Sequence, residues 1–313
     1  MPSVSESPVR IKFWGTRGSI AVPGPGTLRY GGNTACVELR ADGEIIVLDA
    51  GSGIRPLGIA LQKEFQSRPI ELSLLITHAH WDHIQGLPFF KPAYDSNNEI
   101  RIFGFDGTGA TLRDILAEPM RAPFFPITMR ELSARMMINK LSDMKFSLGK
   151  VQVHAALVNH PGVCAGYRIF TSAGSVAFLP DCEPYEFFLH ALRGNRLSSE
   201  QRKEIAADEQ AGLVRFLHGS DILILDGQYT DEEHKNHIGW GHSSISSAVS
   251  LALEAEVQTL LLFHHDPSHD DQMVDTMVES ARELVIKSGS HLEVAGAQQG
   301  SEILLEAKKV AAA

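Results

Sequence analysis

The chain has 313 residues, 43% of them apolar and 21% charged, a composition that supplies a sizeable core and excludes wholesale disorder. Its 28 Lys and Arg against 38 Asp and Glu give a formal net charge of −10, which disfavours non-specific binding to nucleic acid. Three cysteines are too few for a disulfide framework or a Cys-rich zinc module. Neither a signal-peptide pattern nor an apolar run of about 18 residues is present, so we expect a cytoplasmic protein without a membrane span.

Apolar runs bounded by turn residues predict strands along the chain. In chain order these runs are 9–14, 35–40, 44–49, 71–77, 99–105, 151–158, 166–170, 175–180, 221–226 and 258–263. Helices are predicted at 54–66, 110–118, 128–145, 244–255 and 271–287, and the polar stretch 184–217 is expected to be mostly helical. Interleaved strands and helices indicate an α/β fold, with sheet in the middle and helices outside.

The domain organisation follows from the absence of any linker, low-complexity stretch or repeat between the two ends. We therefore predict a single domain over 9–306, with a mostly helical insertion near 184–217. Residues 1–8 and 307–313 are expected to be loose tails.

The densest group of chemistry-bearing residues directly follows the apolar run 71–77. The segment HAHWDH contains His78, His80, Asp82 and His83. In extended backbone His78 and His80 point the same way, whereas Asp82 and His83 lie beyond a bend and can face a second point. Imidazoles and a carboxylate suit zinc, iron or manganese. Because burying these groups together without a metal would be costly, the motif predicts a metal site.

Other candidate ligands also follow predicted strands, and strand ends are where α/β proteins assemble their sites. They are His160 in NHPG, Asp181 in LPDCEP, and one of the neighbours His264 and His265 in LFHHDP. The first histidine after the strand is expected to continue its direction and the second to point to the other face, so we choose His264. Two metals held by these side chains would suit hydrolysis at phosphorus or at a carbonyl. The predicted division is His78, His80 and His160 for one metal, Asp82, His83 and His264 for the other, and Asp181 as the bridge.

In this order, HAHWDH, NHPG, LPDCEP and LFHHDP resemble the metallo-β-lactamase superfamily over roughly residues 9–306. The segments FWGTRGS, GGNTACVEL, LDAGSGIRPLG and GHSS resemble its phosphodiesterase branch, which includes ribonuclease Z, phosphoribosyl cyclic phosphodiesterase and cyclic-nucleotide phosphodiesterases. The resemblance implies an αββα sandwich with a dinuclear site at one sheet edge. It also implies the ligand set above, His264 as the ligand of its pair, and Asp49 as a residue that orients the site.

A late histidine adds to this resemblance. His242 in GWGHSS matches a histidine of the phosphodiesterase branch that pairs with an acid on a preceding strand end and helps to protonate the leaving oxygen. The matching acid is Asp226, where ribonuclease Z-like proteins tend to have Glu. The resemblance thus implies that Asp226 orients His242, and Asp82 is counted as catalytic as well as a ligand.

Together these features predict a metal-dependent phosphodiesterase acting on a small substrate such as a cyclic nucleotide. A hydroxide between two divalent ions, zinc or otherwise manganese or iron, would attack phosphorus. One alternative is a thioester or lactone hydrolase with the same dinuclear site; another is an RNA-processing nuclease of the ribonuclease Z type. The chain lacks a Gly/Pro-rich basic insertion and an early Cys cluster. We expect a small-molecule partner rather than nucleic acid or a membrane, and the resemblance suggests a homodimer.

Two features leave more than one interpretation open. The segments TRGS (16–19) and GGNT (31–34) either offer backbone N–H groups to a phosphate or serve turns alone. His234 and His237 are expected to lie in a solvated loop that could border the pocket, and Cys182 is expected to be structural.

Overall fold

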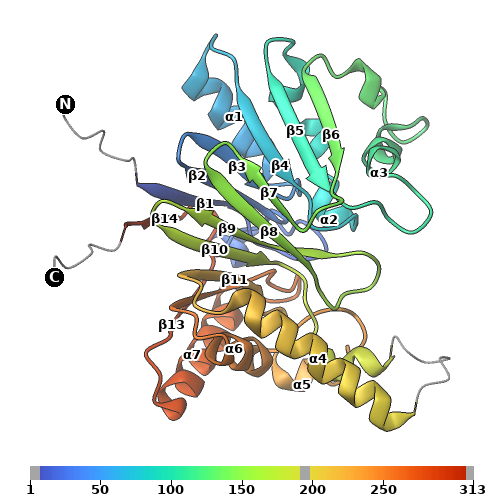
Figure 1. Ribbon diagram of the computed structural model, residues 1–313. Coiled ribbons are helices and arrows are strands. Elements are labelled where there is room, and N and C mark those ends of the chain that lie inside the picture. Colours follow the sequence, from blue (N-terminus) through green and yellow to red (C-terminus); the bar gives the residue numbers. More distant parts are fainter. Residues whose placement is uncertain (1–7, 191–197, 308–313) are drawn as a thin grey trace.

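The computed structural model describes residues 8–190 and 198–307, in which fourteen strands form two seven-stranded sheets that pack face to face (Figure 1). The first sheet has the order β14-β1-β2-β3-β4-β5-β6, and the second has the order β13-β12-β11-β10-β9-β8-β7. The strands of the first sheet are β1 Val9–Gly15, β2 Cys36–Ala41, β3 Glu44–Leu48, β4 Glu71–Leu75, β5 Glu99–Gly104, β6 Arg135–Lys140 and β14 Glu302–Leu305. Those of the second are β7 Lys145–Leu148, β8 Val151–Leu157, β9 Ala165–Thr171, β10 Gly174–Leu179, β11 Ile222–Asp226, β12 Thr259–Phe263 and β13 Glu293–Gly296.

Each sheet has an antiparallel part and a parallel part. Strands β3 to β6 run parallel in the first sheet, and β10 to β13 run parallel in the second. All five residues of β11 are buried, as expected for a parallel strand covered on both faces. The carboxyl ends of β4, β10, β11 and β12 are where most of the predicted site residues follow, so the topology gathers these residues.

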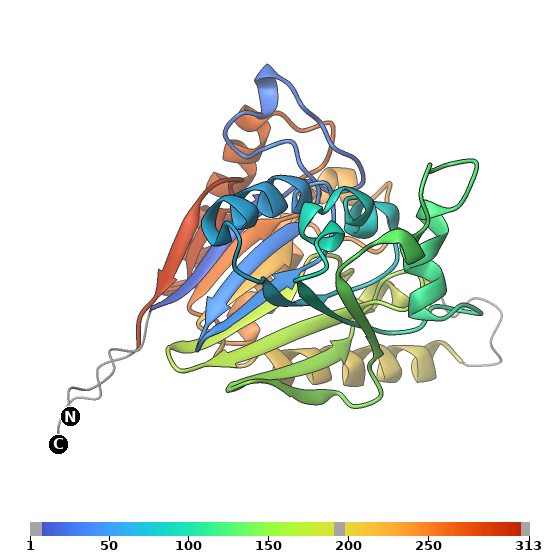
Figure 2. The ribbon, with the colours of Figure 1, turned by 90° about the horizontal axis from the view of Figure 1, so that it is seen from above.

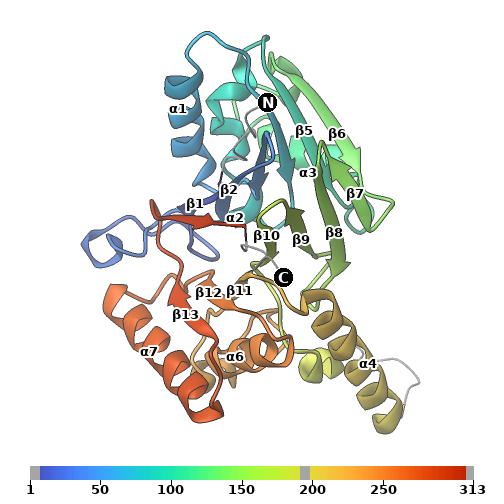
Figure 3. The same ribbon diagram turned by 60° about the vertical axis from the view of Figure 1, so that its left-hand side comes forward.

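Helices cover the outer face of each sheet, as the view from above also shows (Figure 2). The first sheet packs against α1 Ile54–Phe65 and α3 Leu112–Ala117, and the short α2 Trp81–Ile84 lies at its end. The second sheet packs against α4 Ser199–Leu217, α6 Ile245–Glu254 and α7 Asp271–Ser288 (Figure 3), with the short α5 Asp231–His234 nearby. A third apolar cluster fills the space between the sheets. The predicted αββα sandwich is therefore confirmed.

Local sequence signals explain where the long helices begin and end. The side chain of Asp270 accepts a hydrogen bond from the Met273 N–H at the start of α7, and Ser244 accepts one from the Ser247 N–H at the start of α6, as N-cap residues do. Helix α7 ends at Gly289, whose φ of 71° is the left-handed conformation that glycine adopts at a helix C-terminus.

The helix predicted at 128–145 is wrong. After a short 3₁₀ turn at Met129–Glu131, the chain forms β6 and then β7. The backbone of β6 pairs in parallel with β5, and its Met136 and Ile138 pack on the core beneath α3. These two residues alternate at strand spacing, and pairing with a neighbouring strand outweighed the local helical pattern. The four-residue edge strands β13 and β14 were not predicted.

The remaining predicted elements agree with the structure within about two residues at each end. In the stretch 184–217 the structure describes a 3₁₀ helix, η6 Tyr185–His190, and α4. Apart from residues 8 and 307, the expected tails lie outside the described residues. Within the described part of the chain, no helix is both long and apolar enough to cross a membrane.

Candidate metal centre

The histidine motif changes from extended chain to helix in its middle. After β4 the backbone stays extended as far as His80, which has φ −64° and ψ 150° and precedes α2. Asp82 and His83 therefore lie in the first turn of α2 and face a different point from His78 and His80. This bend is the one that the sequence predicted.

The first trio of side chains comprises Asp82, His83 and His264, all of them buried. The Nε2 atoms of His83 and His264 lie 3.3 and 3.1 Å from Asp82 Oδ2. The same two nitrogens lie 3.1 and 3.4 Å from Asp181 Oδ1. Four ligand-type atoms thus converge from α2 and from the ends of β10 and β12.

The second trio comprises His78, His80 and His160. His160 Nε2 lies 2.9 Å from His80 Nδ1. The Nε2 atoms of His78 and His160 lie 3.6 and 3.7 Å from Asp181 Oδ2. Asp181 therefore turns one carboxylate oxygen toward each trio, which is the arrangement expected of a bridging ligand.

The donor set fits divalent metal ions. His78 Nε2, His83 Nε2 and Asp181 Oδ1 are buried and make no hydrogen bond, although an unsatisfied buried polar atom costs free energy. Burial lowers the pKa of His160 to about 4 and that of His78 well below its usual range. Both imidazoles are therefore neutral near pH 7, as ligation requires. Cations of the zinc type would satisfy these atoms.

Asp49 orients the first trio. Its Oδ2 accepts a 2.8 Å hydrogen bond from His83 Nδ1, so that His83 Nε2 is directed at the carboxylates. The backbone N–H and the hydroxyl of Thr77 donate to the same carboxylate. Asp49 itself has a φ of 61°, a left-handed backbone that is uncommon outside glycine and found at functional sites. Its contacts match the role that the resemblance implied.

The two neighbouring histidines after β12 point to different places. His264 Nδ1 lies 2.8 Å from Gln228 Oε1, which leaves Nε2 facing the carboxylates. His265 Nε2 donates to the Ala297 carbonyl at 2.9 Å instead. The reason given from the sequence was wrong, because His264 does not continue the strand: its φ is 59°. A Cβ on Gly18 would lie 2.3 Å from His264 Nδ1, so a glycine at position 18 gives this imidazole its space.

The GWGHSS segment contributes two contacts beside the second trio. The Gly241 carbonyl lies 2.8 Å from His160 Nδ1, and a Cβ on Gly241 would lie 2.2 Å from the same atom. His242 Nδ1 lies 2.8 Å from Asp226 Oδ2, and its ring stacks on that of His264 at 4.9 Å. Burial lowers the pKa of His242, but Asp226 and the carboxylates beyond it outweigh burial and raise this pKa to about 9. The Asp226 carboxylate thus favours the protonated form of the imidazole.

The structure decides between two interpretations that the sequence left open and corrects one expectation. All four backbone N–H groups of the TRGS segment are bonded within the protein, and that of Ser19 donates to Asp82 Oδ2 at 2.7 Å. This segment therefore supports the site rather than offering N–H groups to a phosphate. His234 is buried, 3.7 Å from a Glu183 oxygen, and not in a solvated loop. Cys182 is buried and carries a free thiol.

Three residues that hold the ligands in place were not predicted from the sequence. Gln228 orients His264, Thr77 holds Asp49, and Gly18 leaves room for the His264 ring. Their closeness in the sequence to predicted site residues could have identified two of them. Gln228 lies two residues beyond Asp226 at the same strand end. Thr77 likewise directly precedes the histidine motif.

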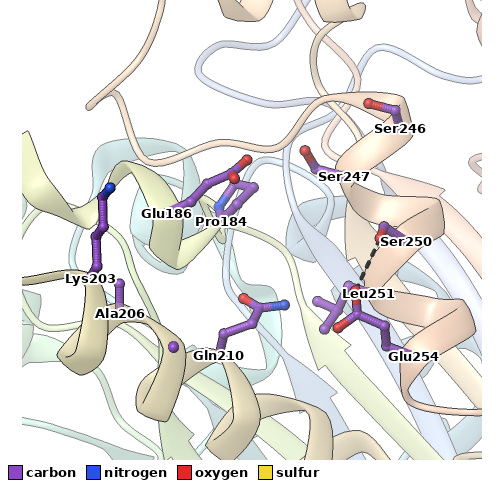
Figure 4. Close-up of a pocket in the computed structure, with 11 residues that line it drawn as sticks. Pro184, Glu186, Lys203, Ala206, Gln210, Ser246, Ser247, Ser250, Leu251 and Glu254 are labelled. Atoms are coloured by element: carbon purple, nitrogen blue, oxygen red, sulfur yellow. Dashed lines mark hydrogen bonds between the residues drawn. The ribbon is translucent and has the colours of Figure 1, made fainter. Parts of the chain in front are cut away.

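Two cavities differ in chemical character. One, of about 650 Å³, lies between η6, α4 and α6 and has a mixed lining that includes the polar residues Lys203, Gln210 and Ser247 (Figure 4). The other, of about 830 Å³, is bordered by Ala79 and Trp81 of the histidine motif and is largely apolar.

Comparison with known proteins agrees with this geometry. Residues 45–198 match the family model described as the beta-lactamase superfamily domain. The chain is 24% identical over 292 residues to a ribonuclease Z of Natronomonas pharaonis, covering 82% of this chain and 86% of that protein. The metallo-beta-lactamase fold protein YhfI of Bacillus subtilis superposes with a TM-score of 0.62 at 17% identity, covering 96% of this chain and all of that one. The short form of human tRNase Z gives a TM-score of 0.60 at 19% identity, covering 95% and 99%.

The fold, the ordered ligand motifs and these matches lead to one conclusion. The chain contains a beta-lactamase superfamily domain, matched over residues 45–198, has the metallo-β-lactamase fold and is a metal-dependent hydrolase.

Proposed function

We propose that the chain is a phosphodiesterase that acts on a small phosphodiester. The observation that carries the proposal is the pairing of His242 with Asp226 beside the ligand cluster. Hydrolysis of a phosphodiester expels an alkoxide, which needs a proton, and a protonated imidazole at the edge of the site can supply it. A thioester releases a thiolate, which departs more readily, so this pair has less to contribute to thioester chemistry.

We propose that two divalent ions bind here, with zinc as the first candidate and manganese or iron as alternatives. The residues that would hold them are His78, His80 and His160 for one ion, Asp82, His83 and His264 for the other, and Asp181 between the two. When bound, such ions supply a water that is nucleophilic at neutral pH and neutralise charge on the phosphoryl oxygens.

The chain's own residues have separate tasks in this proposal. His242 donates a proton to the leaving oxygen as the phosphorus–oxygen bond to it breaks and the bond from water to phosphorus forms. Asp226 keeps the imidazole oriented and protonated, and its other oxygen accepts the Gln228 N–H at 3.0 Å. Asp82, held by the Ser19 N–H, fixes the geometry on the opposite side of the cluster.

A second candidate is cleavage of RNA. It is favoured by the relatives named ribonuclease Z, which align over most of the chain at 21–26% identity. The net charge of −10 favours the small substrate instead, because an acidic protein repels a polyanion on average. A cyclic nucleotide is one example of such a small phosphodiester.

Three further predictions accompany this proposal. We propose that 9–306 form one domain with 184–217 as an insertion, that the chain pairs as a homodimer, and that it works in the cytoplasm. The three buried free thiols support the last of these, since reducing compartments keep cysteines unpaired.

The test combines elemental analysis with a substrate panel. We expect about two transition-metal ions per chain, and faster hydrolysis of bis(p-nitrophenyl) phosphate than of an acyl thioester or a precursor tRNA. His80→Ala should lower both metal content and activity, while the matched control His291→Ala, at an exposed position, should change neither. A fully active wild type that contains no metal after treatment with chelator would refute the metal site. Faster thioester or tRNA turnover would refute the substrate class.

A further inference from the structure

An apolar pocket of about 830 Å³ begins at the histidine motif and extends away from it. One side is formed by α2 and the 3₁₀ turn Leu87–Phe89, and the other by α3 and the segment 118–125. Its lining includes four aromatic residues and two acidic ones, Trp81, Phe89, Phe124, Phe125, Asp114 and Glu118.

The aromatic side chains of this pocket are unusually exposed. Trp81 is 55% exposed, Phe89 is 53% and Phe124 is 81%, while the rings of Phe89 and Phe125 meet edge to face at 5.5 Å. Apolar surface gathered in a concave patch is a mark of a binding site rather than of ordinary protein surface. The fold does not need these rings to face solvent, so their position points to a ligand.

The charge of the pocket restricts what it can bind. None of the described residues that line it is Lys or Arg, and its acidic residues are Asp114 and Glu118. Glu118 is paired with Arg121 at 2.7 Å, and Asp114 accepts a hydrogen bond from the Thr111 hydroxyl. A second phosphate would meet acidic side chains and no lining cation here, so a polynucleotide strand does not suit the pocket.

The pocket lies beside the proposed metal centre. Ala79 and Trp81 line the pocket, and His80, which stands between them in the chain, is the exposed member of the ligand cluster. A phosphodiester whose phosphate lies at the ligand cluster would therefore have an ester group within reach of the pocket. None of the described residues that line the mixed cavity beside α4 and α6 (Figure 4) belongs to the histidine motif.

We propose that this pocket binds an uncharged, apolar ester group of a substrate that has a single phosphodiester, with an aryl group as the best-fitting case. This inference rests on the proposed phosphodiesterase activity and deepens it. Trp81, Phe89 and Phe124 would then determine specificity by the apolar area that they cover, and the preferred substrate would be a hydrophobic diester rather than RNA.

The experiment keeps the leaving group constant and varies the other ester group. The metal-loaded protein is given p-nitrophenyl phenyl phosphate and methyl p-nitrophenyl phosphate, and kcat/KM is measured for both. We expect the phenyl ester to be favoured by about tenfold or more, since even one methylene in an apolar pocket is worth about that factor. Phe89→Ala and Phe124→Ala should each reduce the phenyl ester's kcat/KM more than the methyl ester's, moving the ratio toward one. The control Ile286→Ala, an exposed apolar residue on α7, should leave the ratio unchanged.

The following outcomes would contradict the proposal that the pocket selects the substrate. Equal kcat/KM values for the two esters in the wild type, or a phenyl preference that persists in both variants, would show that the pocket does not select the substrate. A single-stranded oligonucleotide hydrolysed faster than the phenyl ester would do the same.

A binding measurement separates this inference from the proposed function. By calorimetry, the wild type should bind diphenylphosphinate, which cannot be hydrolysed, more tightly than dimethylphosphinate by about tenfold. The two Phe variants should lose most of this difference. If no phosphodiester is hydrolysed but the binding difference holds, the proposed function fails and the pocket stands; equal binding of the two anions rejects the pocket.

Discussion

Two buried carboxylates in this protein each hold a histidine, and the two pairs differ in what the histidine faces. Asp49 Oδ2 lies 2.8 Å from His83 Nδ1, and Asp226 Oδ2 lies 2.8 Å from His242 Nδ1. Neither carboxylate has any exposed surface. Judged by the hydrogen bond alone, the pairs are equivalent.

The groups around the two histidine rings differ. His83 Nε2 lies 3.1 Å from Asp181 Oδ1 and has no hydrogen-bond partner of its own. The ring of His242 stacks on His264 instead, and its Nδ1, already bonded to Asp226, is 3.9 Å from Asp181 Oδ2. An Asp–His hydrogen bond orients an imidazole, but the groups around the ring decide whether it suits a ligand or a proton donor. We therefore predict that His83 holds metal and His242 moves a proton.

The largest effect should follow from His83→Ala. Loss of a metal forfeits both the activated water and several kcal/mol of charge stabilisation, which together correspond to more than about 10⁴-fold in rate. Activity on alkyl and nitrophenyl diesters should fall equally, and metal content should drop when measured by elemental analysis. A variant that retains both metals would place His83 outside the ligand set and remove the contrast with His242.

His242→Ala should reduce activity on an alkyl diester and on a nitrophenyl diester to different extents, whereas His83→Ala should reduce both equally. A general acid contributes about 10²–10⁴-fold, and only a poor leaving group needs it. We expect a loss of that size on an alkyl phosphodiester and a much smaller one on a nitrophenyl diester. Metal content is the deciding control, because His242 also lies within 4.8 Å of ligand atoms of Asp181 and His264. Loss of metal would make His242 a ligand, and equal losses on both substrates would make it a positioning residue.

The two carboxylates offer a matched pair of conservative variants. Asp49→Asn should lower metal affinity by about 10–100-fold, the usual effect of altering a partner behind a ligand. Asp226→Asn should leave metal affinity unchanged and instead reproduce the leaving-group dependence of His242→Ala. Competition with a fluorescent chelator measures the first, and the ratio of alkyl to nitrophenyl turnover measures the second. If both variants weakened metal binding to the same extent, the two pairs would have the same role.

Much of this contrast could be predicted from the sequence, because ligand motifs at strand ends follow from apolar runs and the residues after them. The αββα sandwich and the bend within HAHWDH could be predicted for the same reason. Prediction from the local sequence pattern failed where contacts between residues far apart in the chain determine the structure. Strand β6 exists because β5 lies beside it. The left-handed backbone of His264, and the space that Gly18 leaves for its ring, depend on residues more than 200 positions apart.

The smallest effect on the site is expected for His265→Ala. This variant tests whether His264 or His265 is the metal ligand. His265 is buried, and its Nε2 donates to the Ala297 carbonyl at 2.9 Å. Burial lowers the pKa of His265 to about 3, so the ring is a neutral donor at pH 7. Its removal leaves a buried carbonyl unsatisfied and should lower the free energy of unfolding by about 1–3 kcal/mol, as measured by urea denaturation. Metal content should remain at the wild-type level, whereas His264→Ala should lose metal. The reverse result, with metal lost only from His265→Ala, would mean that the histidine directed at Ala297 is the ligand and that the arrangement around Asp181 does not bind as described.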